Sequence, residues 1–231
     1  MAMPLASSVS SGLERQIRRV LSVVLLLSLI ELVANATSQS NQLNHLSTAW
    51  LALLVLTTLA TGLSSWLTAG MNHFFIAHGL IAGTSLLAWP FMLSEMGSFP
   101  PEMKPWIWWT LGIGTLSFGL FVNWWLGGIF LLSVSSGWLL LSMSQYGGAA
   151  QLASGLQDAV YLILFGCSVI GMINLVRRGG KRADAANSVA IESAIEQARI
   201  DAVERERQRL DALIHDRVLN TLLLSGKAET S

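Results

Sequence analysis

The chain has 231 residues, of which 52% are hydrophobic and only 12% charged, and its basic and acidic residues balance to a formal net charge of zero. Between Val20 and Val176 the only basic residue is Lys104, whereas Arg, Glu and Asp crowd the chain after Arg177. This uneven distribution argues against a single soluble globular domain and indicates a membrane region followed by a cytoplasmic one. The lone cysteine, Cys167, provides neither a disulfide framework nor a cysteine-based metal site within one chain.

The first predicted element is a membrane helix from Arg19 to Ala36. A basic region before an apolar core is also typical of a cleaved signal peptide, which is the alternative. Two features favour a retained helix: the apolar stretch resumes after Glu31, and several more apolar segments follow it.

A helix needs about 20 mainly apolar residues to cross a bilayer. Segments of about this size recur along the chain, and we predict six spans. They lie at Arg19 to Ala36, Leu46 to Leu67, His73 to Leu93, Trp106 to Val122, Leu126 to Met143 and Gln157 to Val176. The predicted fold class is therefore all-α, a six-helix polytopic membrane bundle followed by a cytoplasmic coiled-coil-like helix.

The region from Trp106 to Met143 leaves two interpretations open. Two rather short helices require a tight turn at Asn123-Trp124-Trp125 or at Gly127-Gly128. One long tilted helix would instead give five spans and would put the two chain ends on opposite sides of the membrane.

Basic residues at the span ends favour the first interpretation, because Lys and Arg near spans are retained on the cytoplasmic side. Arg15, Arg18 and Arg19 precede the first span, and a basic cluster beginning at Arg177 follows the last. We therefore expect an even number of spans, both termini in the cytoplasm, and a multi-pass protein of the inner or plasma membrane. The nine tryptophans fit interfacial anchoring, as with Trp66 and Trp106 at predicted span ends.

After the last span, Gly179-Gly180 is expected to interrupt the helix, and a charged helix is predicted from Ala183 onward. Apolar residues spaced four, three and four apart are typical of a weak coiled-coil seam. These residues are Ile191, Ile195, Ala198 and Ala202. A solvated helix without a partner stays an alternative.

Two oppositely charged pairs at helical spacing are predicted to support this helix locally. They are Glu196 with Arg199 and Asp201 with Arg205. Small residues in the fourth span, at Gly112, Gly114, Ser117 and Gly119, suit close packing between membrane helices.

The segment from Glu206 to Leu222 reads E-R-Q-R-L-D-A-L-I-H-D-R-V-L-N-T-L. It resembles the phosphoacceptor segment of the sensor histidine kinases that signal to NarL-type response regulators, with the pattern E-R-x-R-[IL]-x-x-x-[LI]-H-D-x-x-x-[QN]-x-L. The resemblance implies that His215 takes a phosphoryl group from ATP and passes it to an aspartate of the regulator. An ordinary exposed helix histidine is the alternative.

The chemistry of a phosphoacceptor requires a neutral imidazole, and a neighbouring carboxylate that accepts the proton of the other ring nitrogen. On a helical wheel His215 lies about 140° from Leu210, away from an apolar stripe that includes Ile214. The resemblance implies a general-base role for Asp216. It also implies that Asn220, where glutamine is usual, orients water for dephosphorylation of the regulator.

The resemblance covers only about Val203 to Leu224. The chain ends 16 residues after His215, so we expect either a fragment of a longer kinase or a protein that has lost its catalytic half. No cofactor site is predicted in this chain, since ATP and Mg²⁺ belong to the catalytic domain that the family carries. The expected partners are a second copy through the C-terminal helix, a NarL-type response regulator and membrane lipid, with no direct nucleic-acid contact.

Four ionisable residues in or near the predicted spans are candidate functional groups, because such groups are costly in a membrane. They are Glu31, His73, His78 and Asp158. An interfacial position with access to water is the alternative for Glu31 and Asp158. Metal binding by His73 and His78 is disfavoured, because five positions put them about 140° apart on a helix.

These observations divide the chain into four parts: a cytoplasmic segment 1–18, a six-span sensor domain 19–178, a signalling linker 179–202 and an incomplete dimerisation and phosphotransfer domain 203–231. We expect the membrane-embedded sensor part of a two-component histidine kinase. The alternatives are a small transporter or channel subunit that uses Glu31, His73 and Asp158, and a non-catalytic membrane regulator that dimerises with a kinase.

Overall fold

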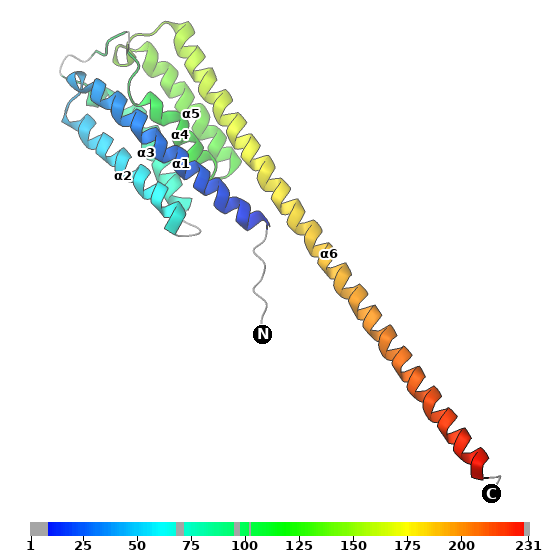
Figure 1. The fold of residues 1–231 in the computed structure, drawn as a ribbon. Helices are drawn as coiled ribbons and strands as arrows, with labels where there is room; N and C mark the ends of the chain where they lie inside the picture. Colours follow the sequence, from blue (N-terminus) through cyan, green and yellow to red (C-terminus); the bar gives the residue numbers. More distant parts are fainter. Residues whose placement is uncertain (1–8, 68–71, 95–97, 102, 229–231) are drawn as a thin grey trace. The chain divides into compact units, whose positions relative to one another are not determined.

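The computed structural model describes residues 9–67, 72–94, 98–101 and 103–228, with the side chains of 67, 216 and 219–228 outside this description. Within these residues the chain is helical and forms no β-strand, which confirms the all-α prediction. It divides into two compact units, Met1–Gly180 and Lys181–Ser231. Figure 1 shows the helices of the first unit running side by side as a bundle.

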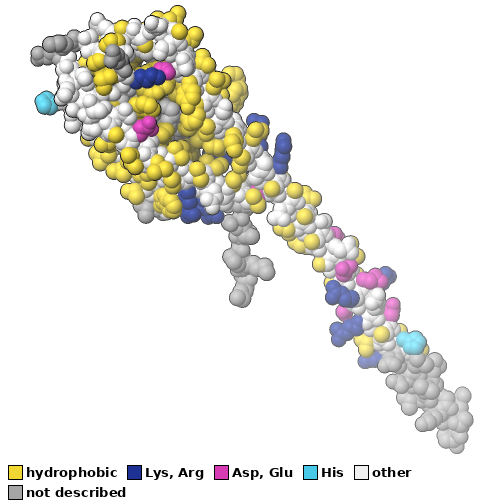
Figure 2. Space-filling view, turned by 45° about the horizontal axis from the view of Figure 1, so that its top comes forward, with side chains coloured by type: hydrophobic (Ala, Val, Ile, Leu, Met, Phe, Trp, Pro, Cys, Tyr) yellow, Lys and Arg dark blue, Asp and Glu magenta, His cyan; other side chains and the backbone are white. Residues whose placement is uncertain are grey.

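The described residues form six α-helices and two short 3₁₀ helices. They are α1 (Val9–Ser38), η1 (Ser40–Gln42), α2 (His45–Leu67), α3 (Asn72–Met92), α4 (Trp108–Gly119), α5 (Trp124–Met143), η2 (Gln145–Gly147) and α6 (Leu152–Ala228). Five of these helices are long and apolar enough to cross a membrane, and α4 is the exception. Figure 2 shows hydrophobic side chains spread over the surface of the bundle.

Helix α4 is short and largely enclosed by protein. Its 12 residues span about 18 Å, which is less than the hydrocarbon thickness of a bilayer. More than half of them are buried, and the helix packs against α1, α3 and α5. Irregular backbone at membrane depth is tolerated where protein encloses it. The chain turns at residues 120–123, so a single long helix is not found. Of the two predicted turn positions, the first is right only for Asn123, because Trp124 already begins α5 and Gly127-Gly128 lies inside it. The full-length fourth span is corrected to this enclosed helix.

Small residues allow α3 and α4 to approach closely. A Cβ added to Gly79 would meet the carbonyl oxygen of Gly114 at 2.6 Å, and one added to Gly114 would collide with the side chain of Ala82. Gly119 likewise faces Gly127 of α5, where a Cβ would lie 3.1 Å from the Gly119 Cα. The packing role predicted for Gly114 and Gly119 is therefore confirmed.

Helix α6 passes through Gly179 and Gly180 without a break, so the predicted interruption is wrong. Each helix-interior glycine costs roughly 1 kcal/mol relative to alanine, which is too little to end a long helix by itself. Gly180 is buried, and a Cβ there would lie 3.1 Å from Leu13 and 3.5 Å from Ser10 of α1. Its missing side chain lets α1 approach α6.

Three loops at one end of the bundle, between α1 and α2, between α3 and α4 and between α5 and α6, are joined by hydrogen bonds. The amide of Gln39, which is 3% exposed, donates to the Lys104 carbonyl at 2.8 Å and accepts from the Trp106 amide at 2.9 Å. The Phe99 amide donates to the Gln145 carbonyl at 2.9 Å. These bonds connect three loops that are far apart in the sequence.

Tryptophans fill the core below these loops. Trp89, Trp106 and Trp138 are almost fully buried, and the Trp89 indole donates to the Tyr146 carbonyl at 2.7 Å. The prediction that Trp106 anchors the bundle at the membrane interface is therefore wrong. Interfacial anchoring remains compatible with Trp66, which is 55% exposed at the other end of α2.

Candidate functional site

His215 lies on the C-terminal part of α6, in the second unit. The helix is regular from Leu152 to Ala228, so the backbone reaches His215 without a break. The imidazole is exposed. This side chain is exposed in the single chain, as expected, but its apolar neighbours are exposed too, so its position away from a paired seam stays a prediction.

The apolar residues next to His215 are also exposed in the single chain. Leu210, Leu213 and Ile214 are 50%, 54% and 60% exposed, and Val218 is 51% exposed. Helical geometry puts His215 about 140° from Leu210, as predicted. An exposed apolar stripe on a helix in water is typical of a surface that a partner covers, and pairing of two copies stays a prediction.

Asp216 and Asn220 follow His215 on the same helical backbone. Their side chains lie outside the described ones. The general-base role of Asp216 and the water-orienting role of Asn220 therefore stay predictions from the resemblance.

The charged pairs predicted in the linker differ in outcome. Arg199 and Glu196 form the expected ion pair at 4.0 Å, with both side chains more than half exposed. Arg205 does not reach the carboxylate of Asp201 and donates instead to its backbone carbonyl at 3.0 Å. The carboxylate of Asp201 accepts from Gln197 at 3.0 Å, so this prediction is wrong in its partner. Figure 2 shows the charged side chains along this part of α6.

The ionisable residues of the bundle do not form one polar path. Glu31 of α1 and His73 of α3 are exposed, whereas His78 of α3 is only 4% exposed. The two histidines therefore occupy different environments, as their spacing predicted. The Nδ1 atom of His78 has no hydrogen-bond partner among the described residues and lies beside a cavity of about 10 Å³, which has room for about one water.

Asp158 of α6 is held by an ion pair that the sequence did not predict. Its carboxylate lies 2.7 Å from the Lys104 ammonium and accepts from the Trp138 indole at 3.4 Å. The Lys104 side chain is 47% exposed and that of Asp158 is 15% exposed. Lys104 is the lone Lys or Arg between Val20 and Val176, and this isolation was the only sign in the sequence that it needs an acidic partner.

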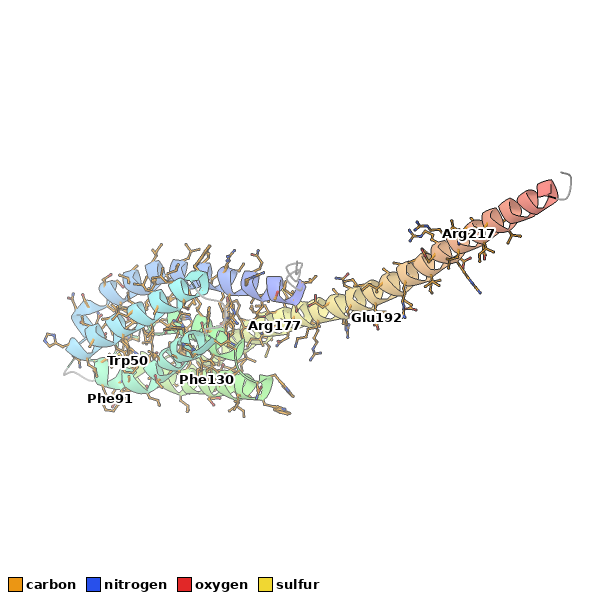
Figure 3. The ribbon with its side chains drawn as sticks, turned by 90° about the horizontal axis from the view of Figure 1, so that it is seen from below. Trp50, Phe91, Phe130, Arg177, Glu192 and Arg217 are labelled. Carbon is orange, nitrogen blue, oxygen red and sulfur yellow. The ribbon has the colours of Figure 1, made fainter. Side chains whose placement is uncertain are left out.

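A second unpredicted contact joins α1 to α6 at the opposite end of the bundle. The Arg177 guanidinium donates to both carboxylate oxygens of Glu14, at 2.7 and 2.9 Å, and to the Leu120 carbonyl at 2.7 Å. Figure 3 labels Arg177 on α6, close to the start of α1. From the sequence, Arg177 is recognisable only as the first residue of the basic cluster that follows the last predicted span.

Comparison of the chain with protein-family models, with curated proteins and with solved structures finds no match. The phosphoacceptor interpretation therefore depends on the residues around His215 alone.

Proposed function

We propose that this chain is the membrane-embedded sensor part of a two-component histidine kinase, in which His215 accepts a phosphoryl group and passes it to a NarL-type response regulator. The observation that carries the proposal is an exposed histidine within the motif from Glu206 to Leu222, on a helix that continues from the membrane bundle. Phosphotransfer needs an imidazole that two different proteins can reach in turn, and exposure of His215 supports this requirement.

The chemistry proceeds at a ring nitrogen of His215. The nitrogen lone pair attacks the γ-phosphorus of ATP, the bond from phosphorus to the bridging oxygen breaks, and ADP leaves. Asp216 accepts the proton from the other ring nitrogen in this proposal. ATP and Mg²⁺ would be supplied by a catalytic domain that acts on this helix.

Pairing of two copies through the C-terminal part of α6 completes the proposal. The exposed apolar side chains of this part are Val189, Ile191, Ile195, Ile200, Val203, Leu210, Leu213, Ile214 and Val218. Such residues in water favour burial against a partner helix by roughly 25 cal/mol per Å² of apolar area. We propose that both chain termini are cytoplasmic, because the basic residues cluster at that end of the bundle.

The proposed relay to His215 uses the continuity of α6. A signal in the bilayer or at the outer loops would shift the packing of α6 in the bundle, and this shift would change the pairing of two C-terminal helices. A transporter is less well supported, because Lys104 neutralises Asp158 while Glu31 and His73 are exposed.

Phosphorylation in trans tests the proposal. The purified chain is incubated with labelled ATP, Mg²⁺ and a separately purified ATP-binding domain of a histidine kinase of this type. We expect acid-labile, alkali-stable label on the parent chain and on the His73→Gln variant, and none on the His215→Gln variant. Label that persists in His215→Gln would reject the assignment, and an unlabelled parent chain would also contradict it.

A further inference from the structure

A cavity of about 500 Å³ opens at the end of the bundle where Arg177 meets Glu14. One part of its wall is apolar and the other is polar. The apolar residues are Leu120, Phe121, Val122 and Leu126, and the polar ones are Glu14, Asn72, Asn123 and Arg177. All of them belong to the first unit. An amphipathic wall of this kind fits a ligand that has both a polar head and an apolar body.

Arg177 keeps donor capacity for such a ligand. A guanidinium has five N–H groups in a fixed fork. The Arg177 guanidinium donates three of its N–H groups to Glu14 and to the Leu120 carbonyl, so two N–H groups remain. The side chain is 20% exposed, so the remaining donors are not sealed from the cavity that Arg177 lines.

The local charge favours an anion. Arg18 lies 3.9 Å from the Glu14 carboxylate, so two guanidinium groups share one acid. Both guanidinium groups also lie over the Phe121 ring, at 5.6 and 5.7 Å from its centroid. The group of three has a net charge of plus one beside an apolar surface, where charge-assisted hydrogen bonds to a phosphate are strong.

The cavity also presents an acceptor without a partner. The Asn72 Oδ1 atom is buried and accepts no hydrogen bond among the described residues. A buried acceptor left unpaired costs free energy, so a ligand that adds a hydroxyl or ammonium donor is favoured. A phosphodiester whose head group has a hydroxyl bonds to Arg177 and, once the Asn72 side chain turns its Oδ1 atom toward the cavity, to Asn72 as well.

Exposed tryptophans put the cavity at the level of lipid head groups. Trp124 and Trp125 follow the lining residue Asn123 directly, and they are 66% and 65% exposed. Exposed indoles at the end of a membrane helix are typical of the interface between hydrocarbon and head groups.

We propose that this cavity binds the phosphodiester head group of an anionic membrane phospholipid. The two remaining Arg177 donors bind the phosphate oxygens, a head-group hydroxyl donates to Asn72, and the glycerol end of the acyl chains lies along Leu126. The inference depends on the proposed insertion of the bundle into a membrane and does not depend on the role of His215.

Because Glu14 and the phosphate compete for one guanidinium, the charge of Glu14 weakens lipid binding. Replacing Glu14 with glutamine keeps its size and removes this competition. A gain of affinity in that variant is informative, since a misfolded protein would not produce it.

The test measures lipid binding to the full chain in detergent by native mass spectrometry, with phosphatidylglycerol and phosphatidylcholine as probes. We expect phosphatidylglycerol to bind better than phosphatidylcholine, which has no net charge and no head-group hydroxyl. Arg177→Gln should weaken phosphatidylglycerol binding by about tenfold or more, because charge-assisted bonds are lost. The exposed neighbour Arg178 provides the matched control, and Arg178→Gln should change binding by less than about twofold.

Glu14→Gln should raise the affinity for phosphatidylglycerol. Equal binding by the Arg177→Gln and Arg178→Gln variants would overturn the proposal, as would reduced binding by Glu14→Gln. Inorganic phosphate or glycerol phosphate that displaces the lipid at equal concentration would overturn the lipid assignment in favour of a free phosphate. His215→Gln should bind lipid like the parent chain, so this inference and the proposed function fail separately.

Discussion

The two parts of α6 differ in what covers their apolar side chains. Up to Gly180 the helix has one buried face, with Ala159 and Leu162 packed into the bundle core. From Lys181 to Val218 every described side chain is exposed except that of Asp184, which is half-buried. One helix therefore contains a part that its own chain covers and a part that its own chain leaves open.

An equally exposed apolar side chain has different energetic consequences in the two parts of α6. Leu164 is 61% exposed and Ile195 is 64% exposed. In the proposed membrane region an exposed leucine faces lipid, at little cost, whereas an exposed isoleucine in water favours association. The comparison teaches that the same exposure predicts lipid contact on the proposed membrane bundle and a protein partner on the C-terminal part.

Cross-linking of the C-terminal part should give the largest difference, because it separates two faces of one helix. Val203 and Leu210 are seven residues apart and share a face, while Gln208 lies about 160° from Leu210. In a Cys167→Ser background, which removes the exposed native thiol, Val203→Cys should form a disulfide-linked dimer almost completely. Gln208→Cys should stay at background on a non-reducing gel. Equal yields of disulfide-linked dimer from Val203→Cys and Gln208→Cys would contradict a partner on one face of the C-terminal part of α6.

Removing a core tryptophan should destabilise the bundle strongly. Trp89 is 0% exposed and its indole donates to the Tyr146 carbonyl, so Trp89→Ala leaves a cavity and an unpaired acceptor. We expect the free energy of unfolding in mixed micelles to fall by about 3–5 kcal/mol. The exposed Trp125 is the control, and Trp125→Ala should cost less than about 0.5 kcal/mol. Similar losses in both variants would argue against the tryptophan core.

Replacement of two glycines with alanine should change the free energy of unfolding in opposite directions. Gly114 has no space for a Cβ because Ala82 occupies it, so Gly114→Ala should destabilise the bundle by about 1–3 kcal/mol. Gly171 on α6 has nothing within 4 Å, and Gly171→Ala should stabilise the helix by up to about 1 kcal/mol. The measurement is again unfolding in mixed micelles. A stabilised Gly114→Ala variant would contradict the close packing of α3 and α4.

The Lys104 to Asp158 ion pair should have the smallest effect, because the lysine side chain is about half exposed. A double-mutant cycle with Lys104→Met and Asp158→Asn isolates the pair from other effects. We expect a small but measurable coupling free energy of about 0.2–1 kcal/mol. A coupling of zero would mean that the pair does not help to hold the loop at Lys104 against α6.

Most helix positions could be predicted from the sequence, because the membrane-sized apolar segments coincide with helices. The predicted spans from Leu46 and from His73 begin within one residue of α2 and α3. The length of α4 could not be predicted, because hydropathy does not reveal whether lipid or protein surrounds a segment. The continuity through Gly179 and Gly180 was missed because two glycines cost too little to end a long helix, and the role of Gly180 in the approach of α1 depends on tertiary packing.

The residues of the candidate sites also differ in whether the sequence could predict their positions. Exposure of His215 could be predicted, because it follows from helical periodicity within a local motif. The pairs of Glu14 with Arg177 and of Lys104 with Asp158 join residues that are 163 and 54 positions apart in the sequence. Such pairs depend on which helices become neighbours, and local periodicity and hydropathy do not reveal this.

The most direct test of the central claim is to locate the phosphoryl group itself. The parent chain, phosphorylated in trans by a kinase ATP-binding domain, is digested at alkaline pH and its peptides are sequenced by tandem mass spectrometry. The account predicts phosphohistidine at His215. A phosphoryl group on another residue, or unmodified His215 alone, would contradict it.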